Sequence, residues 1–401
     1  MTRASHLVLP IMVCLVPQAC LAQAPEGAAE PQADQAQQQD LRMVVPAEIY
    51  AVPGVEMNLY FDNILLHPAS ELLLYDVDCA LGAQQRERWT SVPRADQVGE
   101  HPLTLKVLTP DMRVIDQAQT TVRVTDPAAG AGEQITILCV GDSLTAASLY
   151  TRRLVALFAE DEAVDATLIG ENGPTEEPGN RHEGYGGWTC QRFATTWAET
   201  DWAEVDGVRR RQRSPFVFEV EAQPRLDFQQ YLERNNQGQP PDFITILLGC
   251  NDTFSATEET IEERIDAMFG HLDALLAALR EGAPEADIGL LLLVPPAANQ
   301  DAFASSYGCG QTRWQYRRNQ HRVMEREMAS YGGREDEGLF LVPAFVNLDA
   351  VHGFPHRSIP ANAHTDVEIS RLANGVHPNA AGYYQIGDAI YCWLKSRLAA
   401  R

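Results

Sequence analysis

The sequence has little positive charge. Its 401 residues include 31 lysine and arginine residues against 55 aspartate and glutamate residues, so the formal net charge is −24 at pH 7. A chain this acidic repels nucleic acid and anionic membrane surfaces. We therefore expect neither of these as a partner.

Metal-binding and membrane-spanning patterns are also missing. No two cysteines have CxxC spacing, which argues against a thiolate zinc site. His352 and His356 are four residues apart, but Gly353 and Pro355 between them disfavour the helix that would pair them. No segment after the N-terminal 22 residues has the eighteen uninterrupted apolar residues of a transmembrane helix. We expect no metal site and no membrane insertion.

The first 22 residues are typical of an export signal. A basic start precedes an apolar stretch, residues 7–16, and small residues then lead up to Ala22. We expect cleavage near Ala22 and a secreted or periplasmic protein. Lipid attachment at Cys20 is the alternative, although Pro17-Gln18-Ala19 is a poor match to the small-residue box that it requires.

Composition divides the rest of the chain. Residues 23–40 are rich in alanine, glutamine, proline and acid, and we expect a disordered linker there. Residues 41–125 contain short alternating runs between turn residues, which predict a small all-β, Ig-like sandwich as an accessory domain. Residues 126–133 are expected to be a second linker. The predicted β runs are 55–61, 71–75, 103–108 and 120–124.

From residue 134 to residue 401, strand and helix patterns alternate. Five short, nearly all-apolar runs predict parallel strands buried on both faces, and the segments between them predict crossover helices. This order predicts a three-layer α/β/α domain whose site lies beyond the carboxyl ends of its strands. The predicted strands are 135–140, 166–169, 243–248, 288–294 and 339–342; the predicted helices are 144–160, 191–199, 226–235, 257–280, 311–328 and 380–398.

Four short motifs follow these predicted strands. They are Gly141-Asp142-Ser143-Leu144, the glycine-rich turn around Gly187, Gly249-Cys250-Asn251-Asp252, and His377-Pro378. Each alone has an ordinary structural explanation, such as a helix cap or a turn. Together they fall in loops after strands one, two, three and five, which meet at one edge of the sheet. That edge would unite a serine nucleophile (Ser143), a base (His377) and oxyanion donors (Gly187 and Asn251).

These motifs resemble the blocks of the SGNH (GDSL) hydrolase superfamily, and the resemblance covers residues 134–399. The nearest subset is secreted bacterial proteins with an N-terminal β-sandwich. The resemblance implies a flavodoxin-like sheet, esterase, lipase-like, thioesterase or carbohydrate deacetylase activity, and no metal or organic cofactor. We expect a secreted serine esterase acting on O-acyl esters, O-acetyl above all, of a small molecule or carbohydrate.

One position departs from the family pattern. The family has aspartate three residues before the histidine, where this chain has Asn374. A neutral amide can orient the imidazole but supplies no negative charge. Asn374 itself, an acid from the loop 345–376 (Asp349, Asp366 or Glu368), or a backbone carbonyl could orient His377. The substitution keeps two alternatives open, a glycan-binding protein derived from a hydrolase and, with the same serine chemistry, an acyl transferase.

Further residues near the predicted site are candidates for substrate contact. Asp142, Trp188 and Arg313 all lie in or beside the loops at the expected edge. An aromatic face suits a sugar ring, and arginine suits a carboxylate, which favours an acylated and acidic glycan. Cys190 and Cys309 are candidates for a disulfide at the cleft. The alternative for Arg313 is a structural ion pair.

Overall fold

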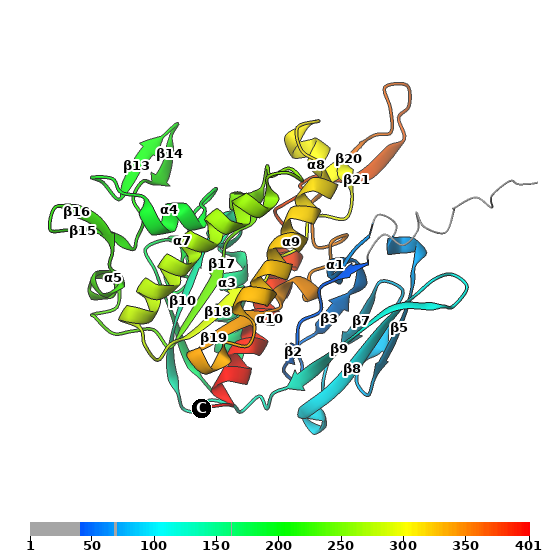
Figure 1. Ribbon diagram of the computed structural model, residues 1–401, viewed down its shortest axis with the longest axis horizontal. Coiled ribbons are helices and arrows are strands. Elements are labelled where there is room, and N and C mark those ends of the chain that lie inside the picture. Colours follow the sequence, from blue (N-terminus) through cyan, green and yellow to red (C-terminus); the bar gives the residue numbers. More distant parts are fainter. Residues whose placement is uncertain (1–40, 68–69, 162) are drawn as a thin grey trace, which may run out of the picture. The chain divides into compact units, whose positions relative to one another are not determined.

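The computed structural model describes residues 41–67, 70–161 and 163–401. The predicted export signal and the linker at 23–40 lie outside these residues. Residues 41–401 form one compact unit, in which a mixed β region precedes an α/β region (Figure 1).

A parallel sheet forms the centre of the α/β region, as the sequence predicts. The strands lie in the order β11-β10-β17-β18-β19, which is 2-1-3-4-5 in chain order, the flavodoxin-like arrangement. A short strand, β12, pairs with the end of β10. The bounds are β10 (Gln134–Gly141), β11 (Asp165–Ile169), β12 (Glu183–Gly184), β17 (Phe243–Leu247), β18 (Asp287–Leu291) and β19 (Leu339–Val342).

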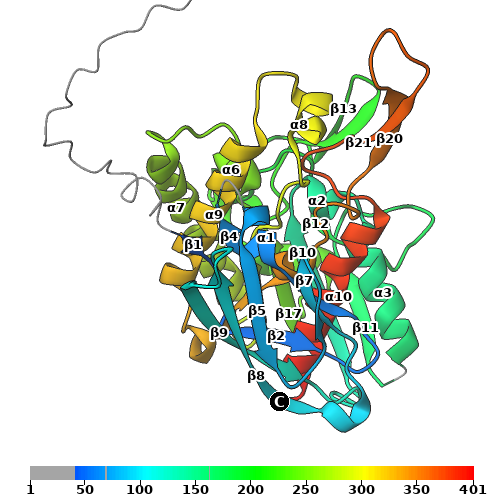
Figure 2. The ribbon, with the colours of Figure 1, turned by 90° about the vertical axis from the view of Figure 1, so that its right-hand side faces the viewer.

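Helices cover both faces of this sheet. Helix α3 packs against α10, and α7 packs against α4, α5 and α9; Figure 2 shows these two groups on opposite sides of the strands. The three predicted layers are therefore present. The bounds are α2 (Ser143–Ala146), α3 (Leu149–Asp161), α4 (Cys190–Thr195), α5 (Phe228–Asn235), α6 (Cys250–Thr253), α7 (Ile261–Gly282), α8 (Gln300–Tyr307), α9 (Arg313–Tyr331) and α10 (Ala380–Leu398).

Two features of this region differ from the sequence prediction. The expected helix 144–160 is broken into α2 and α3, because Ser148 adopts a left-handed backbone with φ of 59°. Three antiparallel hairpins and α8 lie in connections that were expected to be loops. The hairpins are β13 (Trp202–Val205) with β14 (Val208–Arg211), β15 (Val217–Val220) with β16 (Gln223–Leu226), and β20 (His356–Pro360) with β21 (Glu368–Leu372). Short 3-10 turns occur at Glu335–Glu337 and Ala344–Asn347.

The N-terminal β region has two main sheets, consistent with the predicted sandwich. One has the order β2-β9-β8-β5 and the other β3-β7-β6, with a small β1-β4 pair beside them. Trp89 is buried in this region and its indole N–H donates to the Leu81 carbonyl at 2.9 Å. The bounds are β1 (Arg42–Met43), β2 (Glu48–Ala51), β3 (Met57–Tyr60), α1 (Phe61–Ile64), β4 (Leu65–Leu66), β5 (Leu74–Cys79), β6 (Ala83–Gln84), β7 (Arg88–Ser91), β8 (Gly99–Leu108) and β9 (Val114–Val124), with 3-10 turns at Ser70–Leu72 and Ala95–Gln97.

Polar contacts join the β region to the α/β region. The Asp62 carboxylate pairs with Arg313 at 2.8 Å and with Arg317 at 2.9 Å. The Asn63 amide donates to the carbonyls of Phe345 and Leu348, both at 2.8 Å. Because the two arginine side chains are only 9% and 7% exposed, their charges depend on a carboxylate from the other region.

Candidate active site

Ser143 and His377 meet at the carboxyl edge of the sheet. Ser143 is the first residue of α2, directly after β10, and His377 precedes α10. The His377 Nε2 lies 2.8 Å from the Ser143 Oγ although 234 residues separate them. Both side chains are part-exposed. The structure therefore brings together the predicted nucleophile and base, at hydrogen-bond distance and within reach of solvent.

Glycines allow the backbone around Ser143 to pack closely. A Cβ at Gly141 would lie 2.0 Å from the Thr145 hydroxyl oxygen. A Cβ at Gly184 would lie 2.5 Å from the Ala146 backbone nitrogen. No side chain fits at either position, so the tight strand-to-helix turn that presents Ser143 requires both glycines.

The buried carboxylate of Asp142 stabilises this turn by accepting hydrogen bonds. Its Oδ1 accepts the Leu144 N–H at 2.9 Å, and its Oδ2 accepts the Cys250 thiol at 2.9 Å and the Asn251 amide at 3.1 Å. Burial raises the pKa of Asp142 to about 6, although the hydrogen bonds from the Cys250 thiol and the Leu144 N–H lower it. With 1% of its surface exposed, Asp142 is a helix cap that links two motifs, and its contact with substrate stays a prediction.

The predicted oxyanion donors lie on neighbouring loops. Gly187 has φ of 75°, and both Gly186 and Gly187 are exposed. Asn251 is nearby, since its amide donates to the Trp188 carbonyl at 3.0 Å as well as to Asp142. Both amide hydrogens of Asn251 thus have acceptors, and it must release the Trp188 carbonyl to bind an oxyanion. The Ser143 N–H, at the start of α2, has no acceptor within its own helix.

A buried acid, which the sequence analysis missed, supports the glycine loop. Glu183 accepts the Glu171 N–H at 2.7 Å and the Tyr231 hydroxyl at 2.8 Å, and it also binds the Tyr185 hydroxyl. Burial raises the pKa of Glu183 to about 7. Its position directly before Gly184 was the available sequence signal. The network fixes Tyr185, the residue that leads into Gly186 and Gly187.

Asn374 contacts the backbone of the histidine turn and not the imidazole ring. Its Oδ1 accepts the N–H of Val376 at 3.0 Å and of His377 at 2.9 Å. Asp349 binds His352 at 3.0 Å, and Glu368 binds Ser358 in the β20–β21 hairpin. Across residues 41–67, 70–161 and 163–401, no side chain hydrogen-bonds to His377 Nδ1. The amide therefore positions His377 through its main chain.

The expected contacts Trp188 and Arg313 are also buried. Trp188 is 2% exposed and packs against Tyr185 and Phe193, with ring centroids 4.8 and 4.9 Å away. Arg313 pairs with Asp62 and donates to the Ala297 carbonyl at 2.9 Å. Arg313 thus has the structural ion pair that was its alternative, and substrate contact by the two residues stays a prediction.

The proposed cysteine pair is wrong. Cys190 is buried under the glycine loop while Cys309 is exposed. All six cysteines in the described part of the chain are free. The thiol at Cys190 is enclosed, which raises its pKa well above the ordinary value.

The described residues contain neither a cluster of metal ligands nor a membrane-spanning helix. No group of three or more histidine, cysteine, aspartate or glutamate side chains could hold a metal ion there. None of the helices within those residues is long and apolar enough to cross a membrane.

Comparison with known proteins identifies the family. A multidomain esterase of Ruminococcus flavefaciens is 22% identical over 282 residues, which is 67% of this chain and 29% of that protein. A Clostridium thermocellum family 3 carbohydrate esterase structure has TM-score 0.38 and 17% identity, with 67% and 98% of the two chains covered. A Sinorhizobium meliloti carbohydrate acetylesterase family member has TM-score 0.37 and 16% identity, with 67% and 100% covered. The profile of the GDSL-like Lipase/Acylhydrolase family matches residues 139–385, more than half of the sequence, and the chain belongs to that family.

Proposed function

We propose that the protein is an exported serine esterase that removes short acyl groups, O-acetyl above all, from carbohydrate. The observation that carries this proposal is the 2.8 Å contact between Ser143 Oγ and His377 Nε2. Membership of an acylhydrolase family supports the reaction class. The multidomain esterase is the relative whose name supports ester hydrolysis, and this chain spans less than a third of its length.

The reaction proceeds in two steps. His377 Nε2 takes the hydroxyl proton as Ser143 Oγ attacks the ester carbonyl carbon, and the carbonyl oxygen becomes an oxyanion. Collapse of this intermediate breaks the ester C–O bond, and His377 returns the proton to the leaving sugar hydroxyl. His377 then takes a proton from water as the water oxygen attacks the acyl carbon. The bond from that carbon to Ser143 Oγ breaks, His377 returns the proton to Oγ, and the acid leaves. The N–H groups of Ser143 and Gly187 and the Asn251 amide stabilise the oxyanion.

The walls around the nucleophile favour a short acyl group. Large exposed apolar side chains in the described residues are absent from segments 141–190 and 247–256, which carry Ser143, Gly187 and Asn251. A long acyl chain needs apolar surface to leave water. An acetyl group needs little, so the nucleophile and the oxyanion loops suit it better than a fatty acyl chain.

The pH dependence of the reaction should follow His377. Burial lowers the pKa of His377 from its ordinary 6.5, so the ring is neutral and able to accept a proton at and below neutral pH. We expect kcat/KM for p-nitrophenyl acetate to rise with pH and reach half its plateau below pH 6.5. A midpoint above the ordinary histidine value would show that an anionic partner reaches the ring.

Replacing Asn374 by aspartate tests whether a neutral residue limits the rate. A carboxylate here stabilises the imidazolium that forms during attack, so we expect kcat to rise about tenfold and the acidic limb to move to higher pH. The measurement is a pH–rate profile beside Asn362→Asp, which adds the same charge at an exposed position of the same loop. Equal profiles for both variants would show that position 374 does not take the place of the acid.

The same assay separates the two alternative functions. No turnover by the wild type, with activity gained in Asn374→Asp, would favour a glycan-binding protein descended from an enzyme. Transfer of the acetyl group to an added alcohol in preference to water would favour an acyl transferase. Export is tested separately, by the N-terminal mass of the mature protein, which we expect to begin near residue 23.

A further inference from the structure

A pocket of about 720 Å³ lies between the β region and the α/β region. The α/β region contributes Ala298, Arg313, Trp314 and Arg317, which follow β18, and residues 349–352, which follow β19. These loops and the first turn of α9 are at the carboxyl edge of the sheet, as are Ser143 and His377. We propose that this pocket is a subsite for a neutral saccharide chain, which extends from the sugar whose ester is cleaved; this inference rests on the proposed function.

The pocket combines exposed apolar surface with an exposed aromatic ring. Trp314 is 42% exposed, and Leu74 and Val351 beside it are 41% and 45% exposed. A pyranose ring has one apolar C–H face, and stacking on an indole ring removes that face from water while its hydroxyl groups stay at the rim. A volume of 720 Å³ lies within the range of small-molecule sites, about 300–1,000 Å³.

The rim supplies hydrogen-bond acceptors for hydroxyl groups. The Glu71 and Glu87 carboxylates line the pocket and make no hydrogen bond or ion pair to another side chain in the described ranges. The two arginines below Trp314, Arg313 and Arg317, share the single carboxylate of Asp62. Arg86 also lines the pocket, so its positive and negative side chains nearly balance, and the pocket suits a neutral sugar.

Direct hydrogen bonds join the pocket wall to the turn that carries His377. The Ala298 N–H donates to the Ala350 carbonyl at 2.8 Å, and its neighbour Ala297 donates to Gly375 at 3.1 Å. The Asn379 amide donates to the His352 carbonyl at 2.8 Å. An occupant of the pocket therefore rests against the segment that holds the catalytic base.

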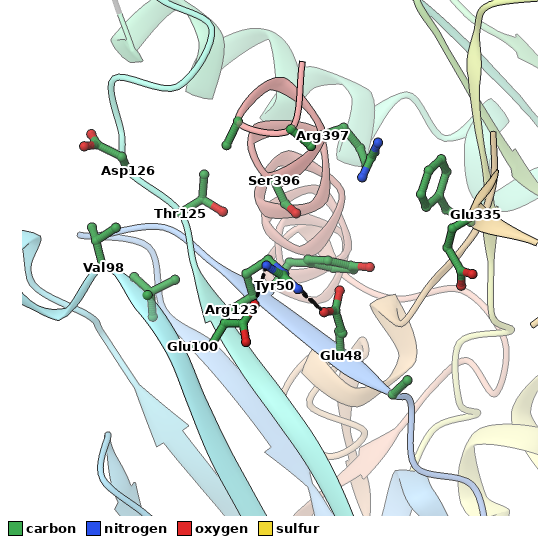
Figure 3. A pocket seen from close by; sticks show the side chains of 16 residues that line it. Glu48, Tyr50, Val98, Glu100, Arg123, Thr125, Asp126, Glu335, Ser396 and Arg397 are labelled. Atoms are coloured by element: carbon green, nitrogen blue, oxygen red, sulfur yellow. Dashed lines mark hydrogen bonds and ion pairs between the residues drawn. The ribbon is translucent and has the colours of Figure 1, made fainter. Parts of the chain in front are cut away.

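Another pocket between the two regions, of about 850 Å³, is lined by no tryptophan. It lies at the amino edge of the sheet, beside Phe340 at the start of β19 and the last turn of α10. Figure 3 shows its Arg123 between Glu48 and Glu100, which neutralise it. Its position at the opposite edge of the sheet from Ser143 gives it no role in binding the substrate.

Trp314→Ala tests the subsite through a ratio of rates. The substrates are an O-acetylated xylohexaose and p-nitrophenyl acetate, which carries no saccharide that could occupy the pocket. We expect the ratio of their kcat/KM values to fall about tenfold in Trp314→Ala and less in Trp314→Phe, which keeps an aromatic face. Met112→Ala, at a 67% exposed apolar residue of the β region outside the pocket, should keep the wild-type ratio.

An unchanged ratio in Trp314→Ala would overturn the subsite, including the case in which both rates fall equally through a structural defect. A second measurement separates this result from failure of the proposed function. If the wild type hydrolyses neither ester, calorimetric titration with unacetylated xylohexaose decides the matter. About tenfold weaker binding by Trp314→Ala than by wild type supports the subsite, and equal binding, or none by the wild type, overturns it.

Discussion

Ser143→Ala is expected to reduce kcat for p-nitrophenyl acetate by about 10⁴-fold or more, as loss of a serine nucleophile does in other hydrolases. The Ser143 hydroxyl is the group whose oxygen lies 2.8 Å from the His377 ring nitrogen. Alanine removes the attacking oxygen while the backbone N–H of residue 143 stays in place. The measurement is the initial rate at saturating ester with the purified full chain, and a parallel melting curve verifies the fold.

A second serine–histidine pair in the molecule provides a matched control. Ser148 Oγ also lies 2.8 Å from a histidine Nε2, that of His182. The Nδ1 of His182 accepts the Gly184 N–H at 3.1 Å, so its proton is on Nε2 and is donated to Ser148. This ring cannot act as a base toward Ser148, and we expect Ser148→Ala to retain activity. Activity lost in Ser148→Ala but kept in Ser143→Ala would reverse the assignment.

Asn251→Ala is expected to reduce kcat by about 10²–10³-fold with little change in KM, because an oxyanion donor acts mainly in the transition state. In the free protein the amide donates to Asp142 at 3.1 Å and to the Trp188 carbonyl at 3.0 Å. The Trp188 bond is the one that can be exchanged for an oxyanion. The assay compares kcat and KM separately for the two proteins.

Thr253→Ser is a suitable control for the Asn251 variant. Thr253 is on the same short helix, α6, is buried, and bonds back to the Gly249 carbonyl at 3.1 Å. Serine keeps that bond, so kcat should stay close to the wild-type value. A loss of less than threefold in Asn251→Ala would remove this residue from the oxyanion site and leave the two backbone N–H groups as its donors.

Much of the α/β region could be predicted from the sequence because its strands are buried on both faces. Such strands appear as continuous apolar runs, and the run 339–342 matches β19 without any shift of its ends. Ser143, Gly187, Asn251 and His377 could be grouped since each follows one of these strands. Topology alone brings such loops to one edge.

The directions of individual side chains could not be predicted in the same way. Trp188 lies in a loop at the expected edge and Arg313 begins helix α9 there, but their side chains turn inward. Arg313 is buried because Asp62, 251 residues earlier, supplies its counter-charge. A contact over that separation has no local pattern. For the same reason Asn374 could be recognised as a departure from Asp-x-x-His, while its bonds to the main chain could not be foreseen.

The ion pairs of Asp62 with Arg313 and Arg317 have a consequence for gene fusion and domain transplantation. A graft that began at residue 134 would carry two nearly enclosed guanidinium groups without their carboxylate. It would also leave the Phe345 and Leu348 carbonyls without the Asn63 amide. The α/β region should therefore not be transferred alone, and a fusion to another polypeptide should begin at residue 41.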